Sequence, residues 1–264
     1  RWEEPIISGE RGSGTIFFCG CNLNCIFCQN YKINHSVMGI EADEETLCRI
    51  MLDLQHQGAH NINLVTPAPH VPLIARTLPL ARQTGLTIPV VYNTNAYENV
   101  QTLKMLEGLI DIYLPDFKYV SSLLAKRYSD AEDYFDVAAK AIAEMYRQVG
   151  NIKLDENGMA ASGVLIRHMV LPGCVDDTRR VLDYVSANYP KNVYISIMSQ
   201  YAPPKDDLPR PINRRITKGE YDRALDYAIS KGFENVFIQQ RNSADLSYTP
   251  DFDADVIFDP IKRA

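Results

Sequence analysis

The sequence predicts an α/β protein, a partial (β/α)6-type, TIM-like barrel of parallel strands. Seven short, nearly continuous apolar runs have the length of buried strands. All but the last are followed by a helix-like or crossover segment, and polar side chains stand directly after several of them. Strands alternating with helices in this number give parallel strands with right-handed crossovers in an open or partial barrel. A doubly wound open sheet is the alternative.

The first third of the chain contains two expected strands and two expected helices. The apolar run 14–19 predicts a strand, and 41–58 predicts a helix with an acidic first turn and a glycine at its end. The short run 61–65 predicts a second strand. It ends at the Pro-rich loop T-P-A-P-H, which cannot continue a sheet. Helical periodicity resumes over 71–85, where Pro79 should kink or split the helix.

The middle of the chain repeats this cycle. Residues 88–94 predict a strand, 98–109 a helix, and 110–118 a strand and its exit. The longest helical pattern covers 130–149, which is rich in alanine with apolar residues three and four apart. The strand expected at 163–173 closes with Pro-Gly, a strong turn signal.

The last third adds two further strands. A helix over 177–187 leads to a strand at 192–201. The polar, Pro-rich stretch 202–217 is too long for a simple connection, and loops of this length are often lids or binding loops. A final helix over 219–231 precedes a strand at 235–241.

The composition is that of an ordinary globular protein of 264 residues, with 46% hydrophobic and 23% charged residues. We predict a single domain over 1–264, with a core at about 14–241 and an irregular tail at 242–264. Because the chain starts at Arg1 without a methionine, a missing N-terminal segment is expected.

Several functional classes are disfavoured. A net charge of −6 argues against nonspecific nucleic-acid binding, which usually needs a basic surface. No apolar stretch approaches the roughly 18 residues of a membrane span. Clustered free thiols without an export signal predict a reducing cytoplasm.

A cluster of cysteines follows the first expected strand. Cys21, Cys25 and Cys28 form the run C-N-L-N-C-I-F-C. A [4Fe–4S] cluster normally takes four cysteine thiolates, one per iron, so three ligands would leave one iron open to a small molecule. A structural zinc site needs four ligands, and no CxxC or HxxxH pair elsewhere completes one. Iron–sulfur ligation is therefore the favoured hypothesis, with zinc as the alternative.

The other cysteines have different expected roles. Cys19 lies two residues before Cys21, so both would point the same way along a strand. It is either a spare ligand or, as we favour, a residue packed beneath the site. Cys48 and Cys174 are predicted to be small buried hydrophobes. Disulfides are not expected, because the long chain has only six cysteines and clusters four of them.

Polar residues stand where the predicted strands end. In parallel barrels and sheets the chemistry lies at the carboxyl ends of the strands. The cysteine loop belongs to the same edge, which would be unexpected if the thiols only filled the core. These strand ends carry Thr66, Asn93, Asp116, Lys118, Arg167 and Gln200.

The motif C-x3-C-x2-C after the first strand, with Phe27 directly before its last cysteine, resembles the radical SAM superfamily. The run F-F-C-G-C-N-L-N-C-I-F-C-Q-N is most similar to pyruvate formate-lyase activating enzymes and their uncharacterised relatives. The segment L-P-D-F-K (114–118) resembles that group's D-x-K signature, and I-R-H-M-V-L-P-G (166–173) resembles its fifth-strand segment. The order and spacing of strands match from Thr15 to Gln240.

The resemblance implies cofactors and a reaction. The three cysteines would hold a [4Fe–4S] cluster, and S-adenosylmethionine would chelate its open iron. One electron would cleave this cofactor to methionine and a 5′-deoxyadenosyl radical that abstracts hydrogen from the substrate. The expected role is installing a glycyl radical on a partner enzyme, with flavodoxin or ferredoxin as electron donor. The alternatives are a radical SAM enzyme for another peptide or small molecule, and a non-catalytic iron–sulfur or zinc protein.

The resemblance also implies cofactor contacts. Phe27 would pack near the adenine, and Thr66 would contact the methionine amino group. Asn93 and Asn95 would meet the nucleoside. As a single residue, Asn93 has a simpler explanation, which is that it holds a turn.

Four further residues are expected around the cofactor. Asp116 and Lys118 would bind ribose and carboxylate, because a carboxylate suits hydroxyls and an ammonium suits an anion. Arg167 and Gln200 would line the deeper pocket. From the residues alone, Asp116 could equally cap a turn, Lys118 could be a solvated charge and Arg167 could form a structural ion pair.

The chain departs from the family pattern in two places. T-P-A-P-H replaces G-G-E after the second strand, and because proline lacks a donor, any contact there must come from Thr66 or a carbonyl. His70 in this loop is expected to be solvated. S-Q-Y-A replaces P-Y-H before the long loop, so the roles of Gln200 and Tyr201 rest on position alone.

Overall fold

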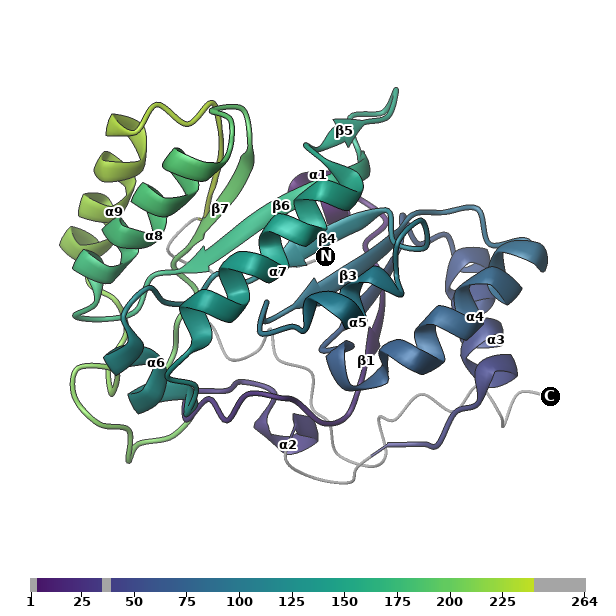
Figure 1. Ribbon diagram of the computed structural model, residues 1–264, viewed down its shortest axis with the longest axis horizontal. Coiled ribbons are helices and arrows are strands. Elements are labelled where there is room, and N and C mark those ends of the chain that lie inside the picture. Colours follow the sequence, from purple (N-terminus) through teal and green to yellow (C-terminus); the bar gives the residue numbers. More distant parts are fainter. Residues whose placement is uncertain (1–3, 35–38, 240–264) are drawn as a thin grey trace.

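The fold is built around a sheet of parallel strands (Figure 1). The computed structural model describes residues 4–34 and 39–239. Seven strands pair in parallel in the order β1-β2-β3-β4-β6-β7-β8, and the short β5 runs antiparallel beside β6. The strand bounds are β1 Gly14–Phe17, β2 Ile62–Val65, β3 Val90–Thr94, β4 Ile112–Pro115, β5 Lys153–Leu154, β6 Ala160–Met169, β7 Tyr194–Met198 and β8 Asn235–Ile238.

The strand order decides between the two predicted architectures. A doubly wound sheet reverses its order at a switch point. Here the parallel strands follow chain order from β1 to β8, and within the described residues the sheet is not closed. The predicted partial barrel is therefore confirmed, and the doubly wound alternative is wrong.

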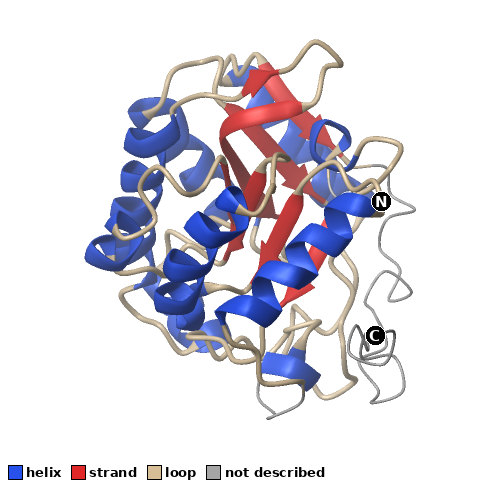
Figure 2. Ribbon diagram, turned by 90° about the vertical axis from the view of Figure 1, so that its right-hand side faces the viewer, coloured by secondary structure: helices blue, strands red, loops and turns tan. Residues whose placement is uncertain are grey.

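Helices surround the sheet (Figures 1 and 2). None of the described helices is both long and apolar enough to cross a membrane. Their bounds are α1 Pro5–Ser8, α2 Tyr31–Asn34, α3 Glu44–His56, α4 Val71–Gln83, α5 Val100–Lys104, α6 Ser122–Ser129, α7 Tyr134–Val149, α8 Val175–Asn188 and α9 Lys218–Ser230, with a 3₁₀ turn at Ala68–His70 before α4.

Alternating strand residues face two separate cores. Leu64 and Tyr92 belong to the large cluster that the strands form with the helices. Val91 and Leu114 point to the opposite face and pack with Ile7 of α1 in a second, smaller cluster. The backbone oxygen of Ile7 also accepts from Asn61 Nδ2, just before β2, at 2.7 Å. Helix α1 therefore covers the amino-terminal end of the inner face, opposite the carboxyl ends of the strands.

The helix predicted at 130–149 is shorter than expected, and a helix that was not predicted precedes it. Helix α7 begins only at Tyr134, and α6 precedes it. Ser121 caps α6 by accepting from Leu124 N at 3.4 Å. Asp130 ends it in the left-handed conformation, with φ 53°. Aspartate reaches this conformation more readily than most residues, but no pattern in the sequence marked the break.

Other boundaries also differ from the prediction. The helix expected at 98–109 is only α5 and turns, and Pro79 does not split α4. The pair of β5 and the start of β6 was not predicted; its turn is held by Asp155 Oδ1, which accepts from two backbone N–H groups.

Two further predictions concern the last quarter of the chain. The stretch 202–217 forms no helix or strand, as predicted. Residues 240–241 of the expected last strand and the tail 242–264 lie outside the described residues.

Candidate functional site

The cysteine loop lies at the carboxyl ends of the strands, directly after β1. Its three cysteines are free and partly exposed. Helix α6 holds the loop through its backbone, because Tyr128 O accepts from Ile26 N at 2.9 Å and Ser129 O accepts from Asn24 N at 3.3 Å. The loop conformation therefore depends on a helix about 100 residues away in sequence.

Each of the three sulfurs has a polar neighbour from a different element. Asn34 of α2 donates its Nδ2 to Cys28 Sγ at 3.0 Å. Ser129 Oγ lies 3.0 Å from Cys25 Sγ. Asn95, after β3, donates its Nδ2 to Cys21 Sγ at 3.4 Å.

Burial governs the electrostatics of this loop. Burial raises the pKa of Cys25 to about 11, although the Lys118 ammonium and the Ser129 hydroxyl oppose this rise. Burial also raises the pKa of Cys28. The charges of Cys21 and Cys28 also raise the pKa of Cys25, and that of Cys21 raises the pKa of Cys28, because like charges repel. Such thiols lose their protons readily only when a cation replaces them.

The donor set fits an iron–sulfur cluster. Within the described ranges, no three His, Cys, Asp or Glu side chains converge on one metal ion. A cluster imposes a different geometry, because each thiolate binds its own iron and the sulfurs need not converge. Three neighbouring sulfurs that receive hydrogen bonds match this need, since such bonds stabilise sulfur ligands.

A group of charges stands beside the loop, at the ends of β4 and β6. Asp116 Oδ1 accepts from Arg167 Nε at 2.9 Å, and Asp116 Oδ2 lies 3.0 Å from Lys118 Nζ. Arg167 also donates an Nη2 hydrogen bond to Asn93 Oδ1 at 2.6 Å. The ion pair considered for Arg167 is therefore present. We call Asp116, Lys118 and Arg167, together with Asn93 of β3, which binds Arg167, the β4–β6 charge group.

The charge group has a net positive charge. Burial alone would raise the pKa of Asp116, but Arg167 and Lys118 outweigh it and hold that pKa below its usual value. Burial would lower the pKa of Lys118, but Asp116 and Cys25 outweigh it and raise that pKa. Two cations thus stand beside one carboxylate, and an ammonium such as that of Lys118 suits an anion such as a ligand carboxylate.

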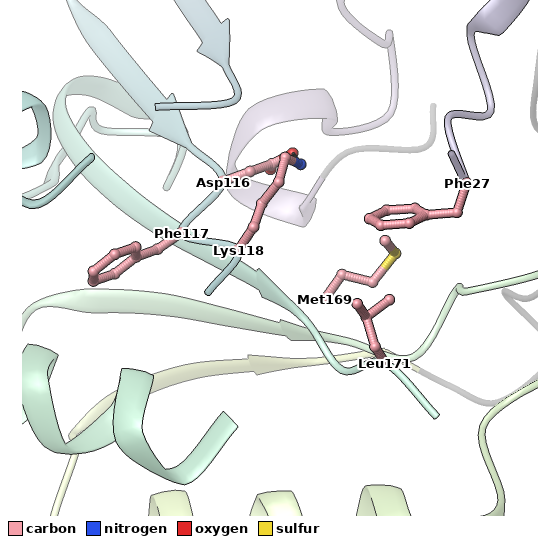
Figure 3. Close-up of a pocket in the computed structure, with 6 residues that line it drawn as sticks. All are labelled: Phe27, Asp116, Phe117, Lys118, Met169 and Leu171. Carbon is pink, nitrogen blue, oxygen red and sulfur yellow. Dashed lines mark hydrogen bonds and ion pairs between the residues drawn. The ribbon is translucent and has the colours of Figure 1, made fainter. Parts of the chain in front are cut away.

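A small cavity, open to solvent, joins the cysteine loop to the charge group (Figure 3). Phe27 lies on one side of it and Met169 and Leu171 on the other, with Lys118 projecting nearby. An apolar wall with a few charged groups is typical of a small-molecule site. Its lining comprises Phe27, Asp116, Phe117, Lys118, Met169 and Leu171.

Of the site residues predicted from the sequence, the cavity brings together Phe27, Asp116 and Lys118. Met169 and Leu171 were not singled out in the sequence. Met169 could have been predicted from the sequence, because it lies two residues after Arg167 on β6 and therefore shares the face of Arg167. Phe117 lies between two predicted residues and is fully buried.

Asn95 and Thr66 are placed differently from one another. Asn95, which was expected at the nucleoside, contacts the cysteine loop through Cys21 and Asn22. Thr66 adopts φ 58°, a left-handed conformation that is unusual for a β-branched residue. Its N–H donates to Asn93 O at 3.1 Å, so it adjoins the charge group through its backbone.

His70 and Gln200 both have protein partners. His70 Nε2 donates to Cys19 O at 2.7 Å, so the expectation of a merely solvated histidine was wrong. Gln200 Oε1 accepts from Gln239 Nε2 at 2.9 Å, beyond β8. Its neighbour Tyr201 is buried and lies edge-on to Phe27, with ring centroids 5.9 Å apart.

The other cysteines are placed as follows. Cys48 and Cys174 are buried, as predicted. Cys19 is partly exposed and precedes the loop.

Comparisons with known proteins agree with this geometry. The family model described as the radical SAM superfamily matches residues 15–185. The uncharacterized protein MJ0674 of Methanocaldococcus jannaschii is 33% identical over 227 residues, which cover 82% of this chain and 62% of that protein. The chain thus spans less than two thirds of this curated relative.

Solved structures show the same fold. SuiB of Streptococcus suis bound to S-adenosylmethionine gives a TM-score of 0.59 at 13% identity, covering 86% of this chain and 50% of that chain. SuiB bound to its precursor peptide SuiA gives 0.58 at 14% identity, covering 86% and 48%. A domain of pyruvate-formate lyase-activating enzyme from Bacteroides vulgatus gives a lower TM-score of 0.44 at 12% identity, covering 66% of this chain and 94% of that chain.

Proposed function

Because the chain belongs to the radical SAM superfamily, we propose that it is a glycyl-radical-enzyme activating enzyme of the pyruvate formate-lyase type. Its cofactors are those of the superfamily, a [4Fe–4S] cluster and S-adenosylmethionine. When bound, they supply the electron and the 5′-deoxyadenosyl radical for hydrogen abstraction. The activity is that of a radical SAM enzyme, and the glycyl-radical substrate is the proposed part.

The observation that carries the proposal is the meeting of sulfur ligands and positive charge at one cavity. Cys21, Cys25 and Cys28 would each bind one iron. Lys118, whose charge reaches Cys25, would hold the carboxylate of S-adenosylmethionine. Phe27 would pack on the adenine from the wall of the cavity.

The remaining site residues would position these groups. Asp116 already binds two cations, yet each carboxylate oxygen can accept a further hydrogen bond, so a ribose hydroxyl can still donate to it. Arg167 holds this carboxylate in place, and Asn93 in turn accepts a hydrogen bond from Arg167. Thr66 would contribute through its backbone, and Gln200 would line the deeper pocket.

The glycyl-radical role is supported by the residues F-F-C-G-C-N-L-N-C-I-F-C-Q-N and L-P-D-F-K. The cavity is also open to solvent, as a partner's glycine loop would require. A radical SAM enzyme for another peptide or small molecule is the second candidate, and the observation in its favour is T-P-A-P-H in place of the usual G-G-E.

The test begins with anaerobic reconstitution. The protein should become brown, its reduced EPR signal should change on adding S-adenosylmethionine, and dithionite should drive release of methionine and 5′-deoxyadenosine. Cys25→Ala should abolish all three effects, whereas Cys48→Ala, a buried cysteine outside the loop, should retain them. A colourless protein with one tightly held zinc would contradict the proposal.

The substrate is tested separately. A glycyl radical enzyme from the same genome, added with the reductant, should show the doublet EPR signal of a glycyl radical. Steady 5′-deoxyadenosine release without such a signal would favour the second candidate.

A further inference from the structure

Three exposed arginines lie on two segments that contact each other: Arg127 of α6, and Arg210 and Arg215 of the long loop 202–217. No carboxylate pairs with any of them among residues 4–34 and 39–239. Their neighbours Lys126 and Arg214, by contrast, pair with Asp130 and Glu220. We call Arg127, Arg210 and Arg215 the arginine patch.

The two segments that carry the patch are joined by a hydrogen bond. Arg127 Nη2 donates to Arg210 O at 3.0 Å, which ties α6 to the loop. Figure 1 shows the green loop lying beside α6.

The loop that carries two of these arginines is held firmly in place. Arg214 binds Glu220 with two hydrogen bonds of 2.8 Å each, and Glu220 also accepts from Gly173 N at 2.7 Å. The Tyr201 hydroxyl donates to Ile212 O. A preorganised loop presents its charges without an ordering cost, which suits a docking surface better than a lid.

The patch lies close to the cysteine loop. Arg127 immediately precedes Tyr128 and Ser129, whose backbone oxygens accept from the cysteine loop. Its guanidinium stands 5.4 Å from the centroid of the Tyr128 ring. Ser129 Oγ is 3.0 Å from Cys25 Sγ. Two consecutive residues of α6 thus separate an exposed arginine from a proposed cluster ligand.

We propose that the arginine patch is the docking surface for an acidic electron-donor protein, such as a flavodoxin. The inference rests on the proposed function, because a radical SAM cluster must receive its electron from outside. One electron passes from the donor to the cluster, and no bond forms or breaks.

Charge complementarity identifies this partner. The chain has a net charge of −6, so an acidic donor is repelled by the molecule as a whole and needs a local positive surface. Such patches direct encounter and orientation, and their effect falls with added salt. A substrate must instead reach the cavity beside Phe27 and Met169, which the patch does not line.

The test measures flavodoxin binding first. Flavodoxin of net negative charge is titrated with metal-free and with reconstituted protein, following the quenching of flavin fluorescence. The combined variant Arg127→Glu, Arg210→Glu, Arg215→Glu should raise the Kd at least tenfold at low salt in both forms, and should lose most of the salt dependence. Arg49→Glu on α3, across the molecule from α6 in Figure 1, should change the Kd less than twofold.

Reduction is measured second, with two donors. In the combined variant, reduced flavodoxin should reduce the cluster at least tenfold more slowly, while dithionite should reduce it within twofold of the wild-type rate. If the combined variant unfolds, Arg215→Glu alone is used, because no side-chain hydrogen bond of Arg215 exists within the described residues; it should raise the Kd at least threefold.

Two results would overturn the proposal. One is an unchanged flavodoxin Kd in the variants, and the other is an equal loss with flavodoxin and with dithionite. A wild-type protein that binds flavodoxin through the patch but releases no 5′-deoxyadenosine with dithionite would contradict the proposed function instead.

Discussion

The ends of β2 and β4 belong to the same edge of the sheet but are built in opposite ways. After β4, Asp116 binds Arg167 and Lys118 through largely buried side chains, which are 23%, 10% and 17% exposed. After β2, Thr66 turns the chain with φ 58° and its N–H donates to Asn93 O. One end is organised by charge and the other by backbone conformation.

This difference indicates how each end can serve a ligand. Charged side chains can hold a charged group of the ligand, and they stay ionised because they compensate one another. A strained turn followed by Pro67 and Pro69 can offer only backbone groups and the threonine hydroxyl. Strain of this kind persists only where the surrounding structure enforces it. We therefore expect the β4 end to dominate cofactor affinity.

The largest expected effect concerns the charge group itself. Asp116→Asn leaves two cations without their carboxylate, and breaking a largely buried ion pair should lower the free energy of unfolding by about 2 to 3 kcal/mol. Urea denaturation measures this change. Asp176→Asn is the control, because that carboxylate is 91% exposed in its pair with Arg179 and should cost under about 0.5 kcal/mol. Equal stability of the two variants would show that the ion pairs of Asp116 do not stabilise the end of β4.

Strand β3, which lies between β2 and β4, offers a pH test. Glu98, after β3, accepts from Tyr92 and Thr94, and burial raises its pKa to about 7 from the ordinary value of 4.5. Its contribution to stability is complete below the unfolded pKa and is lost as pH rises through 7.

Glu98→Gln should therefore gain about 2 kcal/mol of stability over the wild type between pH 5 and pH 8. Urea denaturation at both pH values gives this difference. Because the other titrating groups are common to both proteins, a constant difference across this range would show that Glu98 is not a buried acid.

Cofactor affinity compares the two ends directly. Lys118→Gln removes the proposed carboxylate partner and should weaken S-adenosylmethionine binding about tenfold, or about 1.4 kcal/mol. Thr66→Ala keeps the backbone and should change affinity less than about threefold. Equilibrium binding to reconstituted protein measures both variants. The reverse order of effects would mean that the β2 end dominates instead.

The smallest expected effect is the strain at Thr66. Glycine adopts φ 58° without steric cost but loses more entropy on folding, so Thr66→Gly should be more stable by about 1 kcal/mol. Thr87→Gly, at a position with ordinary φ, should instead be less stable by about 1 kcal/mol. Thermal unfolding compares them. Destabilisation of both variants would show that the Thr66 conformation is not strained.

The sequence by itself determined the parallel barrel, the cysteine motif and the strand ends that carry Asp116, Lys118 and Arg167. These features depend on local periodicity and spacing, which a short segment expresses whatever its partners. Cys48 and Cys174 were likewise predicted to be buried because a lone thiol behaves as a small hydrophobe.

Only the tertiary structure decided which groups touch the sulfurs. Ser129 and Cys25 are 104 positions apart, and Asn95 and Cys21 are 74 apart. The arginine patch likewise joins Arg127 to Arg210 across 83 positions. Such contacts follow from how the parallel crossovers stack their loops at one edge of the sheet. No periodicity in a single segment encodes them, because each depends on the packing of elements that the chain brings together only when folded.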